Sequence, residues 1–367
     1  MIRFAKLGGG WAASIGLCVL LATNCWGANA ATKRVVFLNN TDSPFWDACS
    51  NGLNEGEKQF DLAGAGLKVS WQSNDGTAQG QITKLRQFGT ESDIAAVAIS
   101  VIQADNEAIV NELKKLQAKG IKIITVDGDV NRKKFPGARS HYIGTDNTFG
   151  GKILGKCAQT LLESKNVASG GYVQFAGYTD NDNARSRMDG VKESLDAKKF
   201  TELDRMPDET DRTKARDNVR NAITNHKKNL AALLGIWSYN APAIAEVATQ
   251  MKVRDKLVIA TFDAEEGAIQ QMTLGKIDVM VVQDPYAMGL QTAKLLKAMV
   301  KGDEAEINKV FTDLNQKPGD QLNTGLRVVA PDANTPLNAK QFDGQPVEFM
   351  TLTEFKAWLK KYNLKSS

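Results

Sequence analysis

Two apolar segments of this chain each end at an aspartate, and this pattern constrains the fold more than any other feature. Residues 121–126 precede Asp127, and residues 257–262 precede Asp263. Short, nearly continuous apolar runs of this kind are typical of buried parallel strands. In open α/β sheets, ligands bind at the carboxyl ends of the strands. Two carboxylates at such ends, far apart in the sequence, indicate a cleft built from two halves of the chain.

Strand and helix patterns alternate from residue 34 to about residue 301. Strands are predicted at residues 35–39, 67–72, 95–100, 121–126, 172–175, 231–237, 257–262 and 279–283. Amphipathic segments that predict helices include residues 108–119, 151–163, 241–251 and 288–300. This alternation predicts an α/β protein with βαβ units and doubly wound parallel sheets. A chain of 367 residues is longer than one core usually supports, so we expect two domains.

The remaining segments complete this plan. Residues 140–146 are interpreted as a short strand that leads into the second unit, and residues 325–329 as one more strand. Residues 331–346 are rich in Asn, Asp, Pro and Gly and predict an irregular surface segment, whereas residues 352–362 have helical spacing.

The first 30 residues have the features of a secretory signal peptide. Arg3 and Lys6 are its positive residues, residues 11–21 are mostly apolar, and Ala28 and Ala30 give the small-x-small pattern that precedes cleavage. Cleavage after Ala30 predicts an exported, periplasmic protein. Cys25 leaves lipidation open as an alternative. Only Cys49 and Cys157 follow the signal, too few for a disulfide scaffold, and both are expected to be buried in helices.

An aromatic pair follows the first predicted strand. Asn39 ends that strand, and Ser43 and Pro44 suit the N-cap and first position of a helix. Phe45 and Trp46 then fall in the first helical turn, at the rim of the sheet. They can stack on the apolar faces of a sugar ring or pack in the core. Because neighbours on a helix point in different directions, at most one of them can be wholly core.

The polar candidates lie at later strand ends and at one helix start. Asp127 and Asp263 can accept hydrogen bonds from hydroxyls, bind a cation, act as an acid/base pair, or simply cap a turn. Phe262 offers a second stacking surface. Arg185 and Arg187 begin a predicted helix, where a cation is unfavourable for the helix dipole, so a ligand role for one of them is favoured. Two amide side chains, Asn240 and Gln283, also close strands.

Several chemistries are missing from the sequence. There are only two histidines, and no Cys/His cluster, nucleophile elbow, Walker loop, dinucleotide fingerprint or calcium loop is found. The formal net charge is +4 with both signs interspersed, which gives no nucleic-acid footprint. We therefore expect no catalytic residue, no metal and no cofactor.

In their order and spacing, these residues resemble bacterial periplasmic sugar-binding proteins of ABC importers, the ribose/galactose class of type I periplasmic binding proteins. The resemblance covers about residues 34–330. It is carried by residues 35–46, 121–127, 142–147, 150–152, 184–190, 240, 262–263 and 283. It implies two doubly wound lobes joined by three hinge crossings, near residues 143–146, 283–284 and 325–328. The implied boundaries are 31–144 plus 284–326 for the N-terminal lobe, 145–283 plus 327–345 for the C-terminal lobe, and 346–367 for a C-terminal extension.

The same resemblance implies a set of ligand contacts. The matching positions are Asn39, Ser43, Phe45, Trp46, Asp127, Arg185, Asn240, Phe262, Asp263 and Gln283. Three positions depart from ribose binders, which carry arginine at Gly128, asparagine at Ser43 and an aromatic residue at Thr210. These departures predict a different pocket, open to another pentose, a hexose, a deoxy-sugar or a polyol.

The implied function is that of a monomeric, non-enzymatic receptor that delivers its sugar or polyol to an ABC permease in the inner membrane. Two alternatives stay open. One is a secreted carbohydrate-acting enzyme that uses Asp127 and Asp263 as an acid/base pair. The other is a receptor that signals through a membrane sensor. Sugar-responsive repressors share the fold but carry an N-terminal DNA-binding helix pair, where this chain has an export signal.

Overall fold

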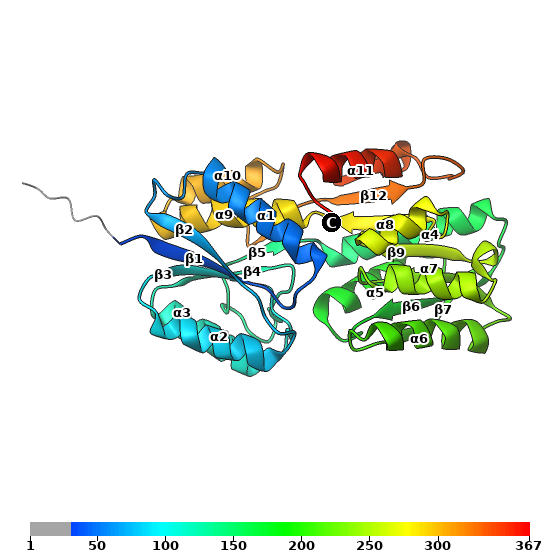
Figure 1. The fold of residues 1–367 in the computed structure, drawn as a ribbon, viewed down its shortest axis with the longest axis horizontal. Helices are drawn as coiled ribbons and strands as arrows, with labels where there is room; N and C mark the ends of the chain where they lie inside the picture. The colour runs from blue at the N-terminus through cyan, green and yellow to red at the C-terminus, as the bar shows by residue number, and fades with distance from the viewer. Residues whose placement is uncertain (1–30) are drawn as a thin grey trace, which may run out of the picture. The chain divides into compact units, whose positions relative to one another are not determined.

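The strands of this protein form two separate sheets, shown in Figure 1 for a computed structural model that describes residues 31–367. The first is a 6-stranded sheet in the order β11-β5-β4-β3-β1-β2, and all its strand pairs are parallel. Its strands are β1 (Lys33–Leu38), β2 (Leu67–Gln72), β3 (Ile94–Ile99), β4 (Lys122–Val126), β5 (His141–Gly144) and β11 (Gln321–Asn323).

The second sheet has 7 strands in the order β13-β12-β10-β9-β8-β6-β7. Its strands are β6 (Gly170–Ala176), β7 (Phe200–Pro207), β8 (Leu230–Gly235), β9 (Val258–Phe262), β10 (Val279–Gln283), β12 (Leu326–Ala330) and β13 (Val347–Thr351). All pairs are parallel except β10 with β12, which is antiparallel. The predicted α/β class with parallel sheets is therefore confirmed.

Helices cover both faces of the first sheet, and we call this sheet with its helices the first lobe. One face packs on α1 (Pro44–Gln59), α9 (Pro285–Lys301) and α10 (Glu304–Thr312), and the other on α2 (Ala78–Thr90) and α3 (Glu107–Ala118). Helices α1 and α9 touch backbone to backbone through glycines. A Cβ on Gly52 would lie 1.9 Å from the Tyr286 carbonyl oxygen, and one on Gly289 would lie 1.9 Å from that of Cys49. No other residue allows this approach.

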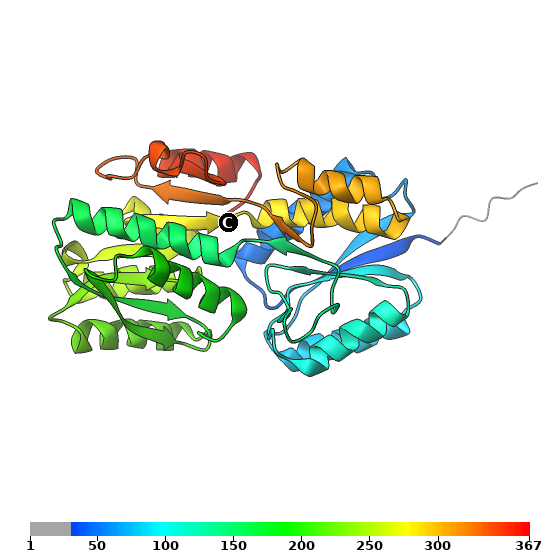
Figure 2. The same ribbon diagram turned by 180° about the vertical axis from the view of Figure 1, so that it is seen from behind.

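The second sheet is also covered on both faces, and with its helices it is the second lobe. One face packs on α4 (Asn147–Ser164) and α5 (Asp182–Ser194), which lie nearest the viewer in Figure 2. The other packs on α6 (Arg212–Asn225), α7 (Asn240–Gln250), α8 (Glu266–Thr273) and α11 (Leu352–Lys361). Two short 3₁₀ helices, η1 (Arg254–Lys256) and η2 (Ala339–Phe342), complete the lobe.

The chain passes three times between the two lobes. It leaves the first sheet after β5 and enters α4, returns after β10 into α9, and crosses again between β11 and β12. These passages place residues 145–146, 284 and 324–325 between the sheets. Because the parallel strands of each lobe end beside these passages, residues that follow β1, β4, β8 and β9 lie near one another.

Several elements differ from the sequence predictions. The sequence did not predict three of the strands, β7, β11 and β13. β7 is an edge strand that carries charged residues, and β11 has only three residues. Residues 346–367, expected as an extension, contribute β13 to the second sheet and α11 to its core. Both Cys49 and Cys157 are buried free thiols in α1 and α4. The predicted signal peptide lies outside the described residues. Within residues 31–367, no helix combines the length and apolar character needed to span a membrane.

Candidate functional site

A cavity of 310 Å³ lies where the carboxyl ends of the two sets of parallel strands meet. Its wall combines segments that follow β1, β3 and β4 in the first lobe with segments that follow β6, β7, β8 and β9 in the second. Its volume is within the range of small-molecule sites, which begins at about 300 Å³. The two apolar runs that end at aspartate therefore meet at one cavity.

Asp127 and Asp263 occupy equivalent positions at the ends of β4 and β9. Both have a left-handed backbone, with φ of 61° and 59°, a conformation that aspartate tolerates better than most residues. The Asp127 amide donates to the Ile143 carbonyl at 2.9 Å, and the Asp263 amide donates to the Val281 carbonyl at 2.8 Å. Each aspartate therefore turns the chain sharply at the end of its strand. Both side chains line the cavity.

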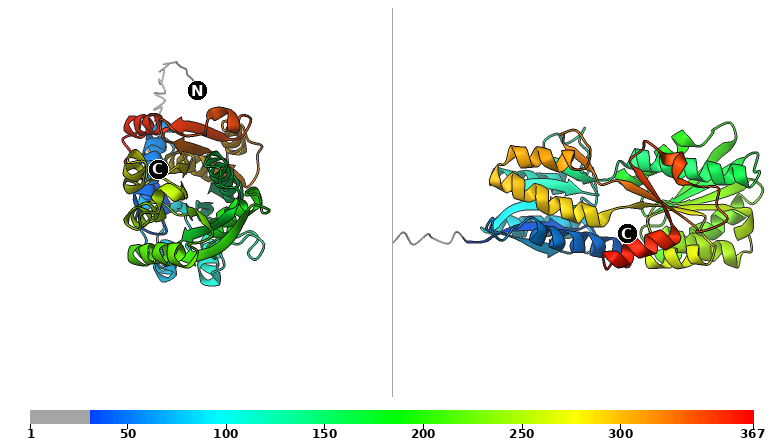
Figure 3. Two further views of the ribbon diagram at one scale, coloured as in Figure 1. Left: turned by 90° about the vertical axis from the view of Figure 1, so that its right-hand side faces the viewer. Right: turned by 90° about the horizontal axis from the view of Figure 1, so that it is seen from above.

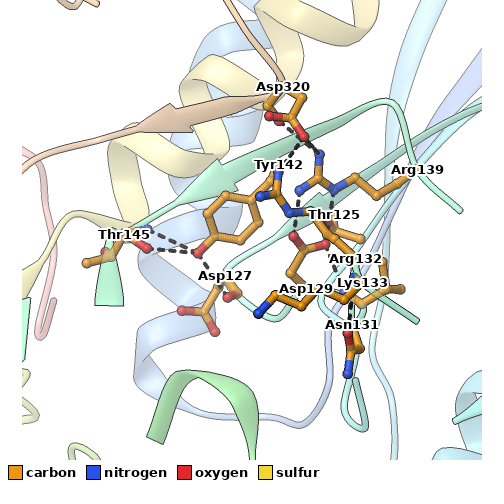
Figure 4. Close-up of polar contacts among 11 residues, drawn as sticks. Thr125, Asp127, Asp129, Asn131, Arg132, Lys133, Arg139, Tyr142, Thr145 and Asp320 are labelled. Atoms are coloured by element: carbon orange, nitrogen blue, oxygen red, sulfur yellow. Dashed lines mark hydrogen bonds and ion pairs between the residues drawn. The ribbon is translucent and has the colours of Figure 1, made fainter. Parts of the chain in front are cut away.

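The loop after Asp127 is held by a buried ion pair (Figure 4). Arg139 donates to Asp129 at 2.6 Å, and the side chains are only 3% and 10% exposed. Thr125 Oγ1 also donates to Asp129, at 2.6 Å. The Tyr142 hydroxyl lies 3.2 Å from the Asp127 carbonyl oxygen and accepts the Thr145 amide at 3.2 Å. These contacts fix the first aspartate against the strand β5 that leads out of the lobe.

Asp263 is held by the end of β10. Gln283 Nε2 donates to its two carboxylate oxygens at 3.2 and 3.1 Å, and the Gln283 amide donates to it at 3.2 Å. The side-chain oxygen of Gln283, Oε1, accepts a hydrogen bond from Thr145 Oγ1 at 2.8 Å. Since Thr145 lies in one passage between the lobes and Gln283 directly precedes another, this contact ties the second aspartate to two of the passages.

Arg187 is a buried cation that faces both aspartates. It is 1% exposed, and its guanidinium lies over the Phe262 ring with 4.5 Å to the centroid. Nε donates to Asn147 at 2.9 Å, Nη1 donates to the Ile236 carbonyl at 3.2 Å, and Nη1 is 3.7 Å from an Asp263 oxygen. Nη2 is buried and has no protein partner among the described residues. Its hydrogen-bonding capacity is therefore not met by residues 31–367.

The aspartates have unusual proton affinities. Burial raises the pKa of Asp127 to about 6, and Arg187 opposes this shift while Asp263 adds to it. Burial also raises the pKa of Asp263, against the opposing effects of Arg187 and the hydrogen bonds from Gln283. The cost of removing a carboxylate from water explains both shifts. No hydrogen bond from within residues 31–367 reaches the Asp127 carboxylate.

Aromatic rings line the cavity from both lobes. Phe45 belongs to the first lobe, and Tyr178, Trp237 and Tyr239 belong to the second. Trp237 lies edge-on to Tyr178 and Tyr239, with centroids 6.3 and 6.5 Å apart. Trp237 Nε1 donates to Asn183 at 3.0 Å, which fixes the orientation of the ring. The cavity thus has apolar surfaces on opposite lobes and charged groups between them.

Six of the ten predicted contact residues line the cavity. They are Ser43, Phe45, Trp46, Asp127, Asp263 and Gln283. Trp46 is only 4% exposed, packs edge-on against Phe45 at 4.9 Å, and belongs largely to the core of the first lobe. Phe45 is half-buried and is the member of the pair that faces the cavity more fully.

The structure places Arg185 away from the cavity. Its exposed side chain pairs with Asp182 at 2.8 Å on the outer face of α5, whereas Arg187 lines the cavity. Residues two apart on a helix point in nearly opposite directions. The buried stripe of α5 contains Ala184, Arg187, Met188 and Val191, and this spacing would have identified the correct arginine.

Three other predicted residues support the site from behind. Phe262 is fully buried and packs under Arg187, because adjacent residues of a strand point to opposite faces. Asn39 is fully buried and accepts the Asn74 amide at 2.7 Å. Asn240 accepts the Trp237 amide at 3.1 Å and so shapes the turn that presents the tryptophan.

Sequence reasoning missed most of the second lobe's contribution. The missed lining residues include Tyr178, Asn181, Asn183, Arg212, Trp237, Ser238, Tyr239 and Glu265, and Arg187 was one of two arginines left open. The segment 237–239 directly follows β8, so its place at a strand end was a usable signal. Arg212 and Glu265 come from different elements and pair at 3.0 and 3.1 Å, which no local pattern indicates.

The arrangement suits recognition of a neutral, hydroxyl-rich molecule. Carboxylates accept hydrogen bonds, the arginine donates them, and aromatic faces cover apolar ring surfaces. In the part of the chain that the structure describes, no three His, Cys, Asp or Glu side chains gather as a metal site.

Comparisons with known proteins agree with this architecture. The chain is 26% identical over 291 residues to the ribose import binding protein RbsB of Haemophilus influenzae, covering 78% of this chain and 91% of the relative. A Burkholderia graminis ABC transporter solute-binding protein, solved in complex with D-arabinose, has a TM-score of 0.69 and 24% identity. That comparison covers 84% of this chain and 99% of the other.

The glucose-galactose binding protein GanP of Geobacillus stearothermophilus has a TM-score of 0.68 at 19% identity, covering 82% and 98% of the two chains. At such identities the solved structures show the fold alone. The model of the periplasmic binding protein domain family matches residues 34–304, which is most of the chain. The two sheets, the three passages and this match together place the chain in the periplasmic binding protein domain family.

Proposed function

We propose that this protein is a receptor that captures one sugar or polyol in the cavity between its lobes and delivers it to an ABC permease. The observation that carries the proposal is the meeting of Asp127, Asp263 and Arg187 at one cavity that aromatic rings line from both lobes. The relatives support it, since one is named for ribose import and a solved structure of the same fold holds D-arabinose.

In this proposal, the charged groups recognise hydroxyls. Asp127 and Asp263 accept hydrogen bonds from the ligand, and Arg187 donates through its unpaired Nη2. Hydrogen bonds to charged groups contribute about 1.5–3 kcal/mol each. A micromolar dissociation constant corresponds to about −8 kcal/mol, so a handful of such bonds suffices after ordering costs are subtracted. Phe45 and Trp237 cover the apolar faces of the ring.

We further propose that the lobes are hinged domains that close on the ligand. The proposed domain limits are residues 31–144 plus 284–326 and residues 145–283 plus 327–345, and residues 346–367, the C-terminal segment, join the second domain through β13 and α11. Thr145 and Gln283 meet at the hinge, and Asn181 reaches across the mouth of the cavity to the Ile102 carbonyl at 3.4 Å. Closure around a ligand is the usual motion of such hinges. The partner protein would recognise the closed form.

The protein releases its ligand unaltered in this account. The raised pKa of Asp127, about 6, is the one observation that would suit a general acid of a carbohydrate-acting enzyme. The receptor and the enzyme hypotheses differ in whether the bound molecule is converted to product. Incubation of the protein with candidate glycosides is expected to give stoichiometric binding and no product, and product formation would favour the enzyme.

The proposed setting is the periplasm, with the protein acting as a monomer beside the inner membrane. A permease and a membrane sensor can both recognise a closed receptor, so the partner needs its own test. Reconstituted permease is expected to take up labelled ligand only with the receptor present; uptake without any receptor dependence would point to a sensor.

The binding experiment is isothermal titration calorimetry with Asp263→Ala. The variant is expected to bind the cognate sugar at least tenfold more weakly, because it loses a buried charged acceptor. Asp255→Ala is the matched control, since Asp255 is exposed and lies outside the cavity. Equal affinity of the two variants would remove Asp263 from the site.

A further inference from the structure

We infer that Ser367, at the end of the C-terminal segment, is a positioning residue of the binding site, an inference that rests on the proposed function. Ser366 and Ser367 are only 3% and 2% exposed. Ser367 lies between the ends of β9 and β10, behind Asp263 and Gln283. In Figures 1 and 3 the C-terminus lies beside the passage from the second lobe to the first.

Ser367 makes three hydrogen bonds to the residues that form the site. Its main-chain oxygen accepts the Ala264 amide at 2.9 Å, and its own amide donates to the Ala264 carbonyl at 3.3 Å. Its hydroxyl donates to the Gln283 backbone carbonyl at 2.8 Å. Ala264 directly follows Asp263, and the side chain of Gln283 donates hydrogen bonds to the Asp263 carboxylate. Ser367 therefore holds the backbone of the residue that follows Asp263 and that of the residue whose side chain binds the Asp263 carboxylate.

The first lobe has an equivalent contact at its own aspartate. Gly128 directly follows Asp127, and its carbonyl accepts the Val101 amide at 3.0 Å while its amide donates to Ser100 Oγ at 3.2 Å. There the residue after the left-handed aspartate is held by the segment that follows the neighbouring strand β3. In the second lobe the equivalent residue, Ala264, is held by Ser367 instead.

A left-handed aspartate needs this support. A non-glycine residue with positive φ is strained, and it persists only where its surroundings hold it in place. A site also loses affinity when its groups move by about 0.5 Å from their required geometry. Without the bonds to Ala264, the turn at Asp263 can relax toward a commoner backbone conformation. The carboxylate then leaves the position in which it faces Arg187 and the cavity.

The rest of the C-terminal segment is fixed to the hinge by aromatic and ionic contacts. The Tyr362 ring lies 4.8 Å from the ring of Tyr286, at the start of α9. Trp358 lies against the Arg327 guanidinium at 4.0 Å, and Arg327 donates to Asp284 at 2.7 Å. Asp284 caps α9 at the passage between the lobes. The segment that ends at Ser367 is thus held against residues at the passage between the lobes.

The test compares a variant lacking residues 366–367 with Ser367→Ala and Ser366→Ala. The Ser366 side chain is as buried as that of Ser367 but makes no hydrogen bond within the described residues, so Ser366→Ala is the matched control. Two measurements are made at 25 °C: amide exchange at Ala264 in the ligand-free protein, and affinity by calorimetry for a sugar that the wild type binds. Melting temperatures report any general loss of stability.

We expect the deletion to speed exchange at Ala264 at least tenfold and to weaken binding at least fivefold in protein that remains folded. Ser367→Ala keeps the backbone pair, so it is expected to weaken binding at least twofold with an unchanged melting temperature. Ser366→Ala is expected to match the wild type in both measurements.

Unchanged affinity in the folded deletion variant, or in Ser367→Ala if the deletion does not fold, would overturn the inference, even if melting temperatures fall. A wild type that binds no sugar would instead refute the proposed function. In that case exchange at Ala264 still decides whether Ser367 holds the turn at Asp263, and unchanged exchange would overturn that role.

Discussion

Replacing Asp127 by asparagine is expected to stabilise the ligand-free protein while weakening its binding of ligand. Asp127 is buried, its carboxylate has no hydrogen-bond donor within the described residues, and burial raises its pKa from 3.8 to about 6. The folded protein therefore holds an ionised carboxylate at neutral pH against the cost of burial. Asparagine removes the charge, keeps the shape and tolerates the same left-handed backbone, φ 61°.

The size of the expected gain in unfolding free energy follows from proton linkage. Between pH 3.8 and about 6, the folded state holds more protons at Asp127 than the unfolded state does, so stability falls as the pH rises through this window. Each pH unit of difference corresponds to about 1.4 kcal/mol. The full difference amounts to about 3 kcal/mol, which is the largest gain in unfolding free energy that Asp127→Asn can give at pH 7. The Asp127 part of the pH dependence should also disappear in the variant.

The assay is urea unfolding of ligand-free wild type and Asp127→Asn at pH 4 and pH 7. The variant is expected to need more urea than the wild type at pH 7, and the two proteins should differ little at pH 4. Binding is expected to weaken about tenfold or more, because a charged acceptor is lost. A variant less stable than the wild type at pH 7 would refute the claim that Asp127 is an unfavourably buried charge kept for its ligand.

Three further substitutions separate binding from stability. Arg187→Ala is expected to reduce affinity at least tenfold by calorimetry, whereas Arg185→Ala should stay within twofold of the wild type; equal effects would contradict the assignment of Arg187. Asp129→Asn leaves the buried Arg139 with only part of its pairing, so unfolding free energy should fall by about 3 kcal/mol in urea, and an unchanged midpoint would count against that ion pair. Trp237→Ala should lose about tenfold in affinity, from an aromatic contact of roughly 1.5 kcal/mol, without loss of the circular dichroism signal of the folded protein.

The fold was largely predictable from local pattern. Buried parallel strands are short apolar runs, and β10 was predicted with its observed limits, residues 279–283. Edge strands were not predictable in the same way. β7 carries charged residues on a half-exposed surface, and β13 joins the sheet by pairing with β12, a contact that its own sequence does not specify.

The candidate site was predictable only where a strand end defines it. Asp127 and Asp263 were found because they terminate apolar runs, and they reach the same cavity. The helix position left Arg185 and Arg187 equally open, and Arg185 was taken from the family resemblance; only the buried face of α5 distinguishes Arg187. Phe262 was misplaced because a neighbour on a strand points the opposite way. The role of Ser367 depends on contacts with residues far away in the sequence, which no local pattern reveals.

Capture of a sugar or polyol by this protein is best tested by a thermal-shift screen of the wild type against pentoses, hexoses, deoxy-sugars and polyols. A ligand that binds only the folded state adds about 2.7 kcal/mol of stability at a concentration one hundred times its dissociation constant. We expect at least one compound to raise the melting temperature by several degrees, increasingly with concentration, and Asp263→Ala to need much more of that compound for the same rise. A melting temperature that no compound moves, at any concentration up to tens of millimolar, would contradict the account.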